Sequence, residues 1–197
     1  MRQETKKKLE AAGLASYTAI HDAPDEDLRK LCAEVCYDEK LFRKRIRLKN
    51  SWYQLLNTHI TLDHIAQEFL SQELPNKGVL KIDRWGLQQK AELLFAMGAM
   101  TKQTMDMVLV VNSLRNKAAH QHGFQVEEKH VDLVLGAFPD GFFEQVGEKP
   151  SFRNMMIVIV ALFEAERQEA EFRALKRKGA LANARRVLEE FQVMPKD

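Results

Sequence analysis

Four polar side chains stand at the end of one apolar segment, in the stretch SLRNKAAHQHGF (113–124). Arg115, Asn116, His120 and His122 follow a run that is rich in Met, Val and Leu. Histidine titrates near neutral pH and can accept or donate a proton. Arginine keeps its positive charge and offers several N–H donors to a phosphate whose negative charge grows in a transition state. These residue types therefore suit phosphoryl transfer without a metal.

RNA is the substrate that fits this chemistry, because its ribose supplies the 2′-hydroxyl as nucleophile and no serine or cysteine is needed. A histidine can remove the proton of that hydroxyl or protonate the leaving 5′-oxygen. The products would be a 2′,3′-cyclic phosphate and a 5′-hydroxyl. In such a site Arg115 would bind the phosphate and His120 would transfer the proton, while Asn116 would orient the arginine or hydrogen-bond a phosphate. No cofactor is expected.

The spacing of the motif sets a condition on this site. Arg115 and His122 are seven residues apart and lie nearly on one face of an α-helix, whereas His120 lies about 140° round the helix from Arg115. Arg115 and His120 converge if the helix unwinds near Gly123, or if two copies of the segment face each other across a two-fold axis. The alternative is a helix end whose cations interact favourably with the helix dipole.

A second basic stretch, LFRKRIRLKNSWY (41–53), places several cations next to Trp52 and Tyr53. Basic residues beside aromatic ones suit a nucleic-acid strand, through phosphate contacts and base stacking. A solvated helix face explains the same pattern equally well. Together with two residues of the motif, the predicted RNA-binding residues are Arg43, Lys44, Arg45, Arg47, Lys117 and His122.

The composition is that of an ordinary soluble protein. The chain has 197 residues, is 45% hydrophobic and 29% charged, and can bury a core in one domain. With 30 basic and 28 acidic side chains its net charge is +2, so any nucleic-acid contact must come from a local patch. Its first residues, MRQETKKKLEAAGL, contain no apolar run suited to a signal peptide or membrane span, and we expect a cytoplasmic protein. Cys32 and Cys36 are expected to be a reduced, buried pair.

No metal site is expected. His59, Asp63 and His64 crowd one helical segment, but the two histidines are five residues apart and do not match the i, i+4 spacing of helical zinc ligands. His59 also lies within the apolar stripe, which favours a hydrogen-bonded histidine of the core or of an interface. His120 and His122 have no evident third ligand nearby.

Helical periodicity runs through nearly every long segment and predicts an all-α helical bundle. The run MMIVIV (155–160) alone resembles a strand, but it continues without a break into a helical pattern. Ser51 is expected to cap one helix, Asp22 or Asp25 another, and Gly179 to interrupt the last long one. We expect helices over residues 51–74, 84–100, 104–120, 126–138, 151–178 and 180–191, with 84–98 and 104–120 antiparallel and joined tightly near Thr101.

The segment LRNKAAH, preceded by KAELLFAMGAMTKQTMDMVLVVNS, resembles the HEPN superfamily, the higher eukaryotes and prokaryotes nucleotide-binding domain. The family signature is an arginine, four to six further residues and a histidine, often with an asparagine directly after the arginine. A short helix, a turn and a second helix that leads into the motif are also typical. The resemblance is best over residues 50–138. By position, Arg115 and His120 fall on the catalytic pair of the family, and Asn116 on its frequent polar partner.

The resemblance implies a HEPN-like up-and-down helical bundle that dimerises through the motif helix, here 104–122. It further implies a metal-independent endoribonuclease of the kind that serves as a toxin or in phage defence, with RNA as substrate and an antitoxin or regulatory protein as a possible partner. The expected organisation is a helical N-terminal extension (1–48), a HEPN-like core (49–138) and C-terminal helices packed on or extending that core (139–197). No membrane association is expected.

Two other interpretations remain open. Some HEPN-like proteins, among them the mannitol operon repressor group, have lost parts of the catalytic pair and are regulatory, which would make this chain a silent module that binds a nucleotide or a protein. One branch of HEPN toxins carries a tyrosine two residues after the histidine, and a partner nucleotidyltransferase modifies it. His122 occupies that place here. The third interpretation is a helical interaction module in which the motif is accidental.

Overall fold

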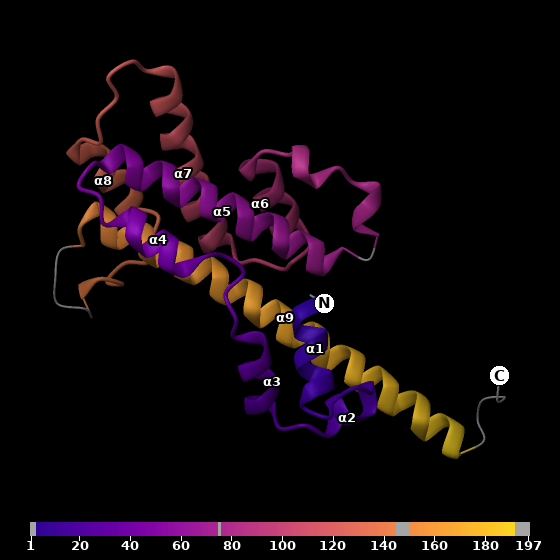
Figure 1. The fold of residues 1–197 in the computed structure, drawn as a ribbon. Helices are drawn as coiled ribbons and strands as arrows, with labels where there is room; N and C mark the ends of the chain where they lie inside the picture. Colours follow the sequence, from indigo (N-terminus) through magenta and orange to yellow (C-terminus); the bar gives the residue numbers. More distant parts are fainter. Residues whose placement is uncertain (1–2, 75, 145–149, 192–197) are drawn as a thin grey trace. The chain divides into compact units, whose positions relative to one another are not determined.

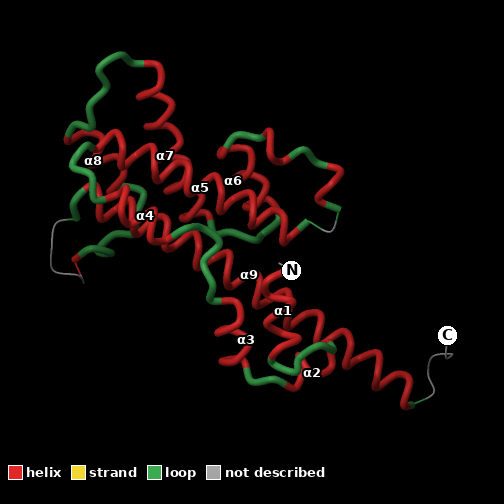
Figure 2. Tube along the Cα trace, in the orientation of Figure 1, coloured by secondary structure: helices red, strands yellow, loops and turns green. Residues whose placement is uncertain are grey.

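The computed structural model describes residues 3–74, 76–144 and 150–191 (Figure 1). Within these residues every regular element is a helix and there is no strand (Figure 2). The fold is therefore an all-α helical bundle, as the helical periodicity predicted. The strand-like run 155–160 lies inside the long helix α9 (Phe152–Glu190).

The chain divides into two compact units. The larger unit, residues 35–167, contains the start of α9 together with α4 (Glu39–Ile46), α5 (Ser51–Glu73), α6 (Leu87–Ala96), α7 (Lys102–His120) and α8 (Glu128–Leu135). The smaller unit, residues 1–34 and 168–197, contains the end of α9 together with α1 (Gln3–Ala11), α2 (Tyr17–Asp22) and α3 (Asp25–Cys32). The unit boundaries, after residues 34 and 167, differ from the expected domain boundaries after residues 48 and 138. Within the expected C-terminal region (139–197), residues 145–149 and 192–197 lie outside the described residues.

The core of the larger unit forms around α5, which packs against α4, α6 and α7. Because apolar residues recur at helical spacing, each helix turns one stripe of side chains inward. The rings of Phe69 on α5 and Phe163 on α9 lie 6.1 Å apart, so the apolar start of α9 belongs to the same core. The fully buried residues of this core include Leu55, Leu62, Ile65, Phe69, Ala91, Leu94, Val108, Val111, Leu114, Val134, Met155, Ile159 and Phe163.

Helix starts differ in detail from the expected ones. The cap of α5 is Asn50, whose Oδ1 accepts from the backbone N–H of Trp52 at 2.9 Å, and Ser51 is the first residue of the helix. Helix α3 begins at Asp25 after Pro24, without a side-chain cap, and Asp22 is the last residue of α2. The N-cap positions are Asn50 and Pro24, so the capping predictions for Ser51, Asp22 and Asp25 are wrong by one or two positions. Asn50 was as suited to capping as its neighbour Ser51, and α3 starts without any side-chain cap.

Helices α6 and α7 are joined by the short link 97–101 and pack against each other. Helix α6 is shorter than the expected 84–100, because residues 82–84 form a 3-10 turn and Gly98 leaves the helix with a φ of 68°. Thr101 caps α7, and its hydroxyl accepts from the backbone N–H of Thr104 at 3.2 Å.

Glu166 of α9 reinforces the start of α7. Its carboxylate accepts from the backbone N–H of Thr101 at 3.1 Å and from the hydroxyl of Thr104 at 2.8 Å. A carboxylate at a helix N-terminus is stabilising because it faces the positive end of the helix dipole. The packing of α9 thus holds the helix that carries the motif.

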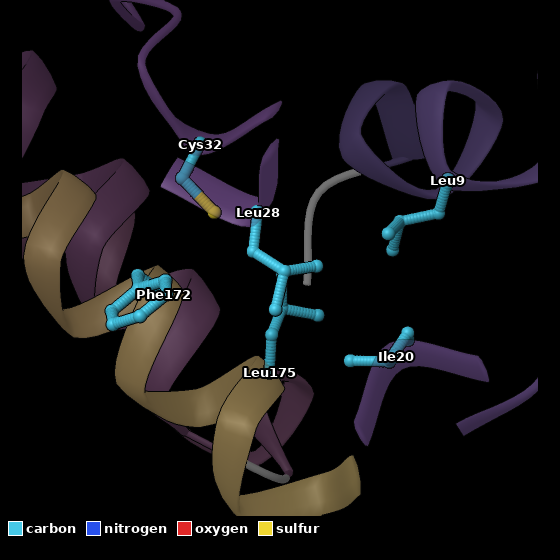
Figure 3. Packing of buried hydrophobic residues seen from close by; sticks show 6 residues of the cluster. All are labelled: Leu9, Ile20, Leu28, Cys32, Phe172 and Leu175. Atoms are coloured by element: carbon cyan, nitrogen blue, oxygen red, sulfur yellow. The ribbon is translucent and has the colours of Figure 1, made fainter. Parts of the chain in front are cut away.

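In the smaller unit, α1, α2, α3 and the end of α9 share a small apolar core (Figure 3). The residues labelled there are Leu9, Ile20, Leu28, Cys32, Phe172 and Leu175. The prediction that Gly179 interrupts the helix is wrong, since α9 runs through it. A Cβ at Gly179 would lie 3.0 Å from the backbone nitrogen of His21 and 3.3 Å from the carbonyl oxygen of Tyr17. The glycine therefore permits close packing against α2.

Candidate functional site

Helix α7 positions the RNKAAH motif at its C-terminal end. The helix is regular through His120, Gln121 forms its C-cap, and Gly123 follows with a φ of 74°. Unwinding near the glycine therefore begins only after His120 and does not bring this histidine toward Arg115. On a regular helix the two residues point about 140° apart. Within one chain the structure does not bring the expected catalytic pair together.

The motif residues differ in exposure. Arg115 is half-buried, whereas Asn116, Lys117, His120 and His122 are exposed. The guanidinium of Arg115 donates from Nη1 to Oδ1 of Asn116 at 3.3 Å. Asn116 therefore contacts the arginine, as one of its two expected roles requires.

The Nε atom of Arg115 is buried and has no hydrogen-bond partner within the described residues. A buried N–H without an acceptor costs free energy, typically about 1–3 kcal/mol. The positive charge of this side chain thus lies at the edge of the core with donor capacity that the described chain does not use. Arg115 as a whole is half-buried, so another part of its side chain stays within reach of an anion from outside.

His59 of α5 faces the same region of α7. Its Nε2 lies 3.1 Å from Oδ1 of Asn112, which is one helical turn before Arg115 and only 8% exposed. The pKa of His59 is lowered, mainly by burial and further by the positive charge of Arg115, although the hydrogen bond to Asn112 opposes the shift. His59 is therefore a neutral, hydrogen-bonded histidine close to Arg115 at neutral pH.

An ion pair lies next to this histidine. Nζ of Lys90 on α6 donates to Oδ1 of Asp63 on α5 at 2.8 Å, and the Lys90 side chain is 1% exposed whereas that of Asp63 is 36% exposed. Asp63 raises the pKa of His59 and Lys90 lowers it, so both charges face the imidazole. The three helices thus meet at a polar seam formed by His59, Asp63, Lys90, Asn112 and Arg115.

Sequence reasoning missed most of this seam. It identified His59 as a hydrogen-bonded histidine of the apolar stripe, but not its partner. The available signal was the position of Asn112 and Lys90, both polar residues at core positions of their helices. A buried polar residue in an apolar stripe requires a partner. The partner itself cannot be read from local spacing.

The basic stretch lies on α4 and the link to α5. Phe42 and Ile46 turn inward, and the basic residues between and after them are exposed. Arg43 pairs with Glu39, one turn earlier on the same helix, at 2.6 Å. In the described part of the chain no ion pair involves the other predicted RNA-binding cations, Lys44, Arg45, Arg47 and Lys117.

Aromatic and apolar side chains adjoin these cations. Tyr53 is 53% exposed and Leu48 50% exposed, while Trp52 is half-buried. Both exposed side chains lie next to the basic residues in the chain. The structure thus places exposed positive charge beside an exposed aromatic side chain, a combination that suits single-stranded nucleic acid.

The exposed side of α7 forms a groove with α8. This groove has a volume of about 880 Å³, and its apolar lining includes Leu109, Val110, Leu133 and Ala137. Lys102 and Asp106, which form an ion pair on α7, also line it. Apolar side chains are thus accessible on the same helix that carries the motif.

The two cysteines are free thiols and differ in burial. Cys32 is buried and Cys36 half-buried, and neither forms a disulfide. The thiol of Cys36 donates to Oε2 of Glu164 at 3.2 Å, and burial together with the negative charge of Glu164 raises its pKa. Among the described residues no group of three His, Cys, Asp or Glu side chains is arranged to hold a metal ion.

Comparisons with protein-family models, with curated proteins and with solved structures find no match to this chain. Within the described helices, none combines the length and apolar character that a bilayer span requires.

Proposed function

We propose that this protein is a metal-independent endoribonuclease of the HEPN type, which cleaves RNA by attack of a 2′-hydroxyl on the adjacent phosphate. The observation that carries the proposal is Arg115, a half-buried arginine whose Nε donor is buried and has no partner within the described chain. A phosphate oxygen would provide the missing acceptor once the guanidinium turns its Nε edge toward the ligand. Charge-assisted bonds of this kind strengthen as negative charge develops on the phosphate.

The roles proposed for the motif residues follow from their chemistry and their positions on α7. Arg115 binds the scissile phosphate, and Asn116 holds the guanidinium through its 3.3 Å hydrogen bond. His120, exposed at the end of α7, transfers a proton to or from the reacting oxygens. The exposed Lys44, Arg45 and Arg47 bind flanking phosphates, and Tyr53 stacks on a base.

The site requires two copies of the chain. Because Arg115 and His120 point to different sides of one regular helix, a shared cleft forms when two α7 helices face each other across a two-fold axis. The apolar groove beside α7, with Leu109 and Val110, offers accessible surface for such a dimer. Each cleft then takes Arg115 from one copy and His120 from the other.

The first experiment tests the chemistry. Labelled RNA and the matching DNA are incubated in excess EDTA with wild type, Arg115→Ala, His120→Ala and the matched control His122→Ala. RNA alone should be cut, leaving 2′,3′-cyclic phosphate ends, because DNA lacks the nucleophile. Arg115→Ala and His120→Ala should each lower the rate by about 10²- to 10⁴-fold, and His122→Ala should have a smaller effect. Equal cleavage by all four proteins, or cleavage abolished by EDTA, would refute the proposal.

The second experiment tests the shared cleft. Arg115→Ala and His120→Ala proteins are mixed, allowed to exchange subunits and assayed on RNA. A mixed dimer contains one cleft with both groups intact, so random exchange should restore about one quarter of the wild-type activity. No recovery from a mixture that has formed mixed dimers would exclude a composite site. A protein that is monomeric by ultracentrifugation at micromolar concentration would do the same.

The alternative is a catalytically silent, HEPN-like regulator that binds a nucleotide or a protein. It is favoured by the separation of Arg115 and His120 on one regular helix, because a binding site needs the arginine without the histidine. In that case His120→Ala would leave ligand binding unchanged, and Arg115→Ala would weaken it. A role as a toxin or in phage defence, and an antitoxin as partner, are proposed only together with the ribonuclease function and not with the regulator.

A further inference from the structure

One histidine of the polar seam, His59, lies near Arg115 within a single chain, whereas His120 of the motif points away from it. Asn112 and Arg115 are three residues apart on α7 and therefore lie on one face, and Asn112 contacts His59 at 3.1 Å. The charge of Arg115 acts on the imidazole. Both His59 and Arg115 are half-buried, so each keeps a part that faces outward.

The hydrogen bond to Asn112 also determines where the imidazole proton lies. An amide oxygen only accepts, so the 3.1 Å contact with Asn112 Oδ1 places the hydrogen of neutral His59 on Nε2. Nδ1 then keeps its lone pair, and no hydrogen bond to it is found in the described part of the chain. A neutral imidazole with a free lone pair can accept a proton, although the charge of Arg115 disfavours the imidazolium that forms.

We propose that His59 is the general base of the ribonuclease site, and that it accepts the 2′-hydroxyl proton at Nδ1 beside the phosphate held by Arg115 of the same chain. This inference rests on the proposed ribonuclease function. The O2′–P bond forms as that proton moves to His59. The P–O5′ bond breaks, and a protonated His120 of the other copy gives its proton to the 5′-oxygen. Each cleft thus uses one histidine as base and another as acid.

The charged groups around His59 define its pH range. Arg115 on α7 and Lys90 on α6 disfavour the imidazolium, Asp63 on α5 favours it, and burial disfavours it most. The pKa of His59 is therefore below the ordinary value for histidine. A base must be unprotonated, so kcat/KM should decrease as the pH falls through this lowered pKa and should be constant just above it.

The kinetic test compares His59→Gln with His64→Gln. His64 lies five residues further along α5, is exposed and hydrogen-bonds the carbonyl oxygen of Cys36 at 2.8 Å, so it controls for the substitution itself. On RNA in EDTA, His59→Gln should lower kcat/KM by about 10²- to 10⁴-fold and remove the decrease at acidic pH, while His64→Gln should match wild type. Equal activity of the two variants would overturn the inference.

Asn112→Asp provides a readout that a merely structural role would not change. A carboxylate in place of the amide would raise the pKa of His59, so the acidic decrease of kcat/KM should move to higher pH. An unchanged pH profile in a folded Asn112→Asp protein would count against His59 as the base.

A measurement on wild-type protein keeps the inference testable if the variants fold poorly. In a protein with ¹⁵N-labelled histidine, the signals of His59 at pH 7 should report a neutral ring with its hydrogen on Nε2. A ring that is protonated at pH 7 cannot accept the proton, and a ring that carries its hydrogen on Nδ1 cannot accept it at that atom, so either result would overturn the inference. If the wild-type protein does not cleave RNA at all, both the proposed function and the role of His59 are refuted. If the His59→Gln protein stays active, only the role of His59 is refuted.

Discussion

The buried ion pair of the polar seam leads to a prediction in which the two partners are not equivalent. Lys90 donates to Asp63 at 2.8 Å, but the Lys90 side chain is 1% exposed and the Asp63 side chain 36% exposed. Asp63→Asn leaves an ammonium in the core without its counter-charge. Lys90→Met leaves a carboxylate that water can reach. We therefore predict that Asp63→Asn destabilises the protein considerably more than Lys90→Met.

The expected magnitudes follow from these exposures. Removal of one partner from a fully buried pair costs about 3–5 kcal/mol. The partial exposure of Asp63 lets water replace some of the lost interaction, and the asparagine oxygen still accepts a hydrogen bond. We expect a loss of about 2–3 kcal/mol for Asp63→Asn. Lys90→Met removes the buried charge and keeps an unbranched side chain of similar length, so its cost should be within about 1 kcal/mol.

Urea unfolding followed by circular dichroism at pH 7 measures both values. The double variant Asp63→Asn/Lys90→Met should be more stable than Asp63→Asn alone, because the unpaired charge is gone. Asp106→Asn is the matched control, since Asp106 pairs with Lys102 on the exposed side of α7 and should contribute at most about 0.5 kcal/mol. A Lys90→Met protein that is less stable than Asp63→Asn would refute the reasoning.

Two further predictions concern other parts of the chain. Gly179→Leu should lower the free energy of unfolding by about 1–3 kcal/mol, because its Cβ would lie 3.0 Å from the backbone of His21, whereas Ala184→Leu on the exposed side of α9 should have little effect in the same urea assay. Cys36 should react with iodoacetamide at pH 8 at least about tenfold more slowly in the folded than in the urea-unfolded protein, because its raised pKa keeps it a thiol. Mass spectrometry of the alkylated peptide measures this, and equal rates would contradict it.

The sequence by itself determined the fold class and the location of the motif. Helical periodicity is a local property, because each helix satisfies its own backbone and the apolar stripe repeats every three to four residues. The strand-like run 155–160 could therefore be assigned to a helix from its continuation. Thr101 at the start of α7 and His120 at its end are also local features, and the structure has them at these places.

Only the tertiary structure decided which polar groups meet. His59 and Asn112 are 53 residues apart and come into contact because α5 and α7 pack together, and Asp63 finds Lys90 across α5 and α6 in the same way. Glycine commonly ends helices, but Gly179 lies inside α9, where the absence of a Cβ allows close packing against α2. From residue type and spacing one can infer that a buried polar group needs a partner, or that a glycine leaves space for a neighbour. Which partner it finds depends on contacts between helices that no local pattern contains.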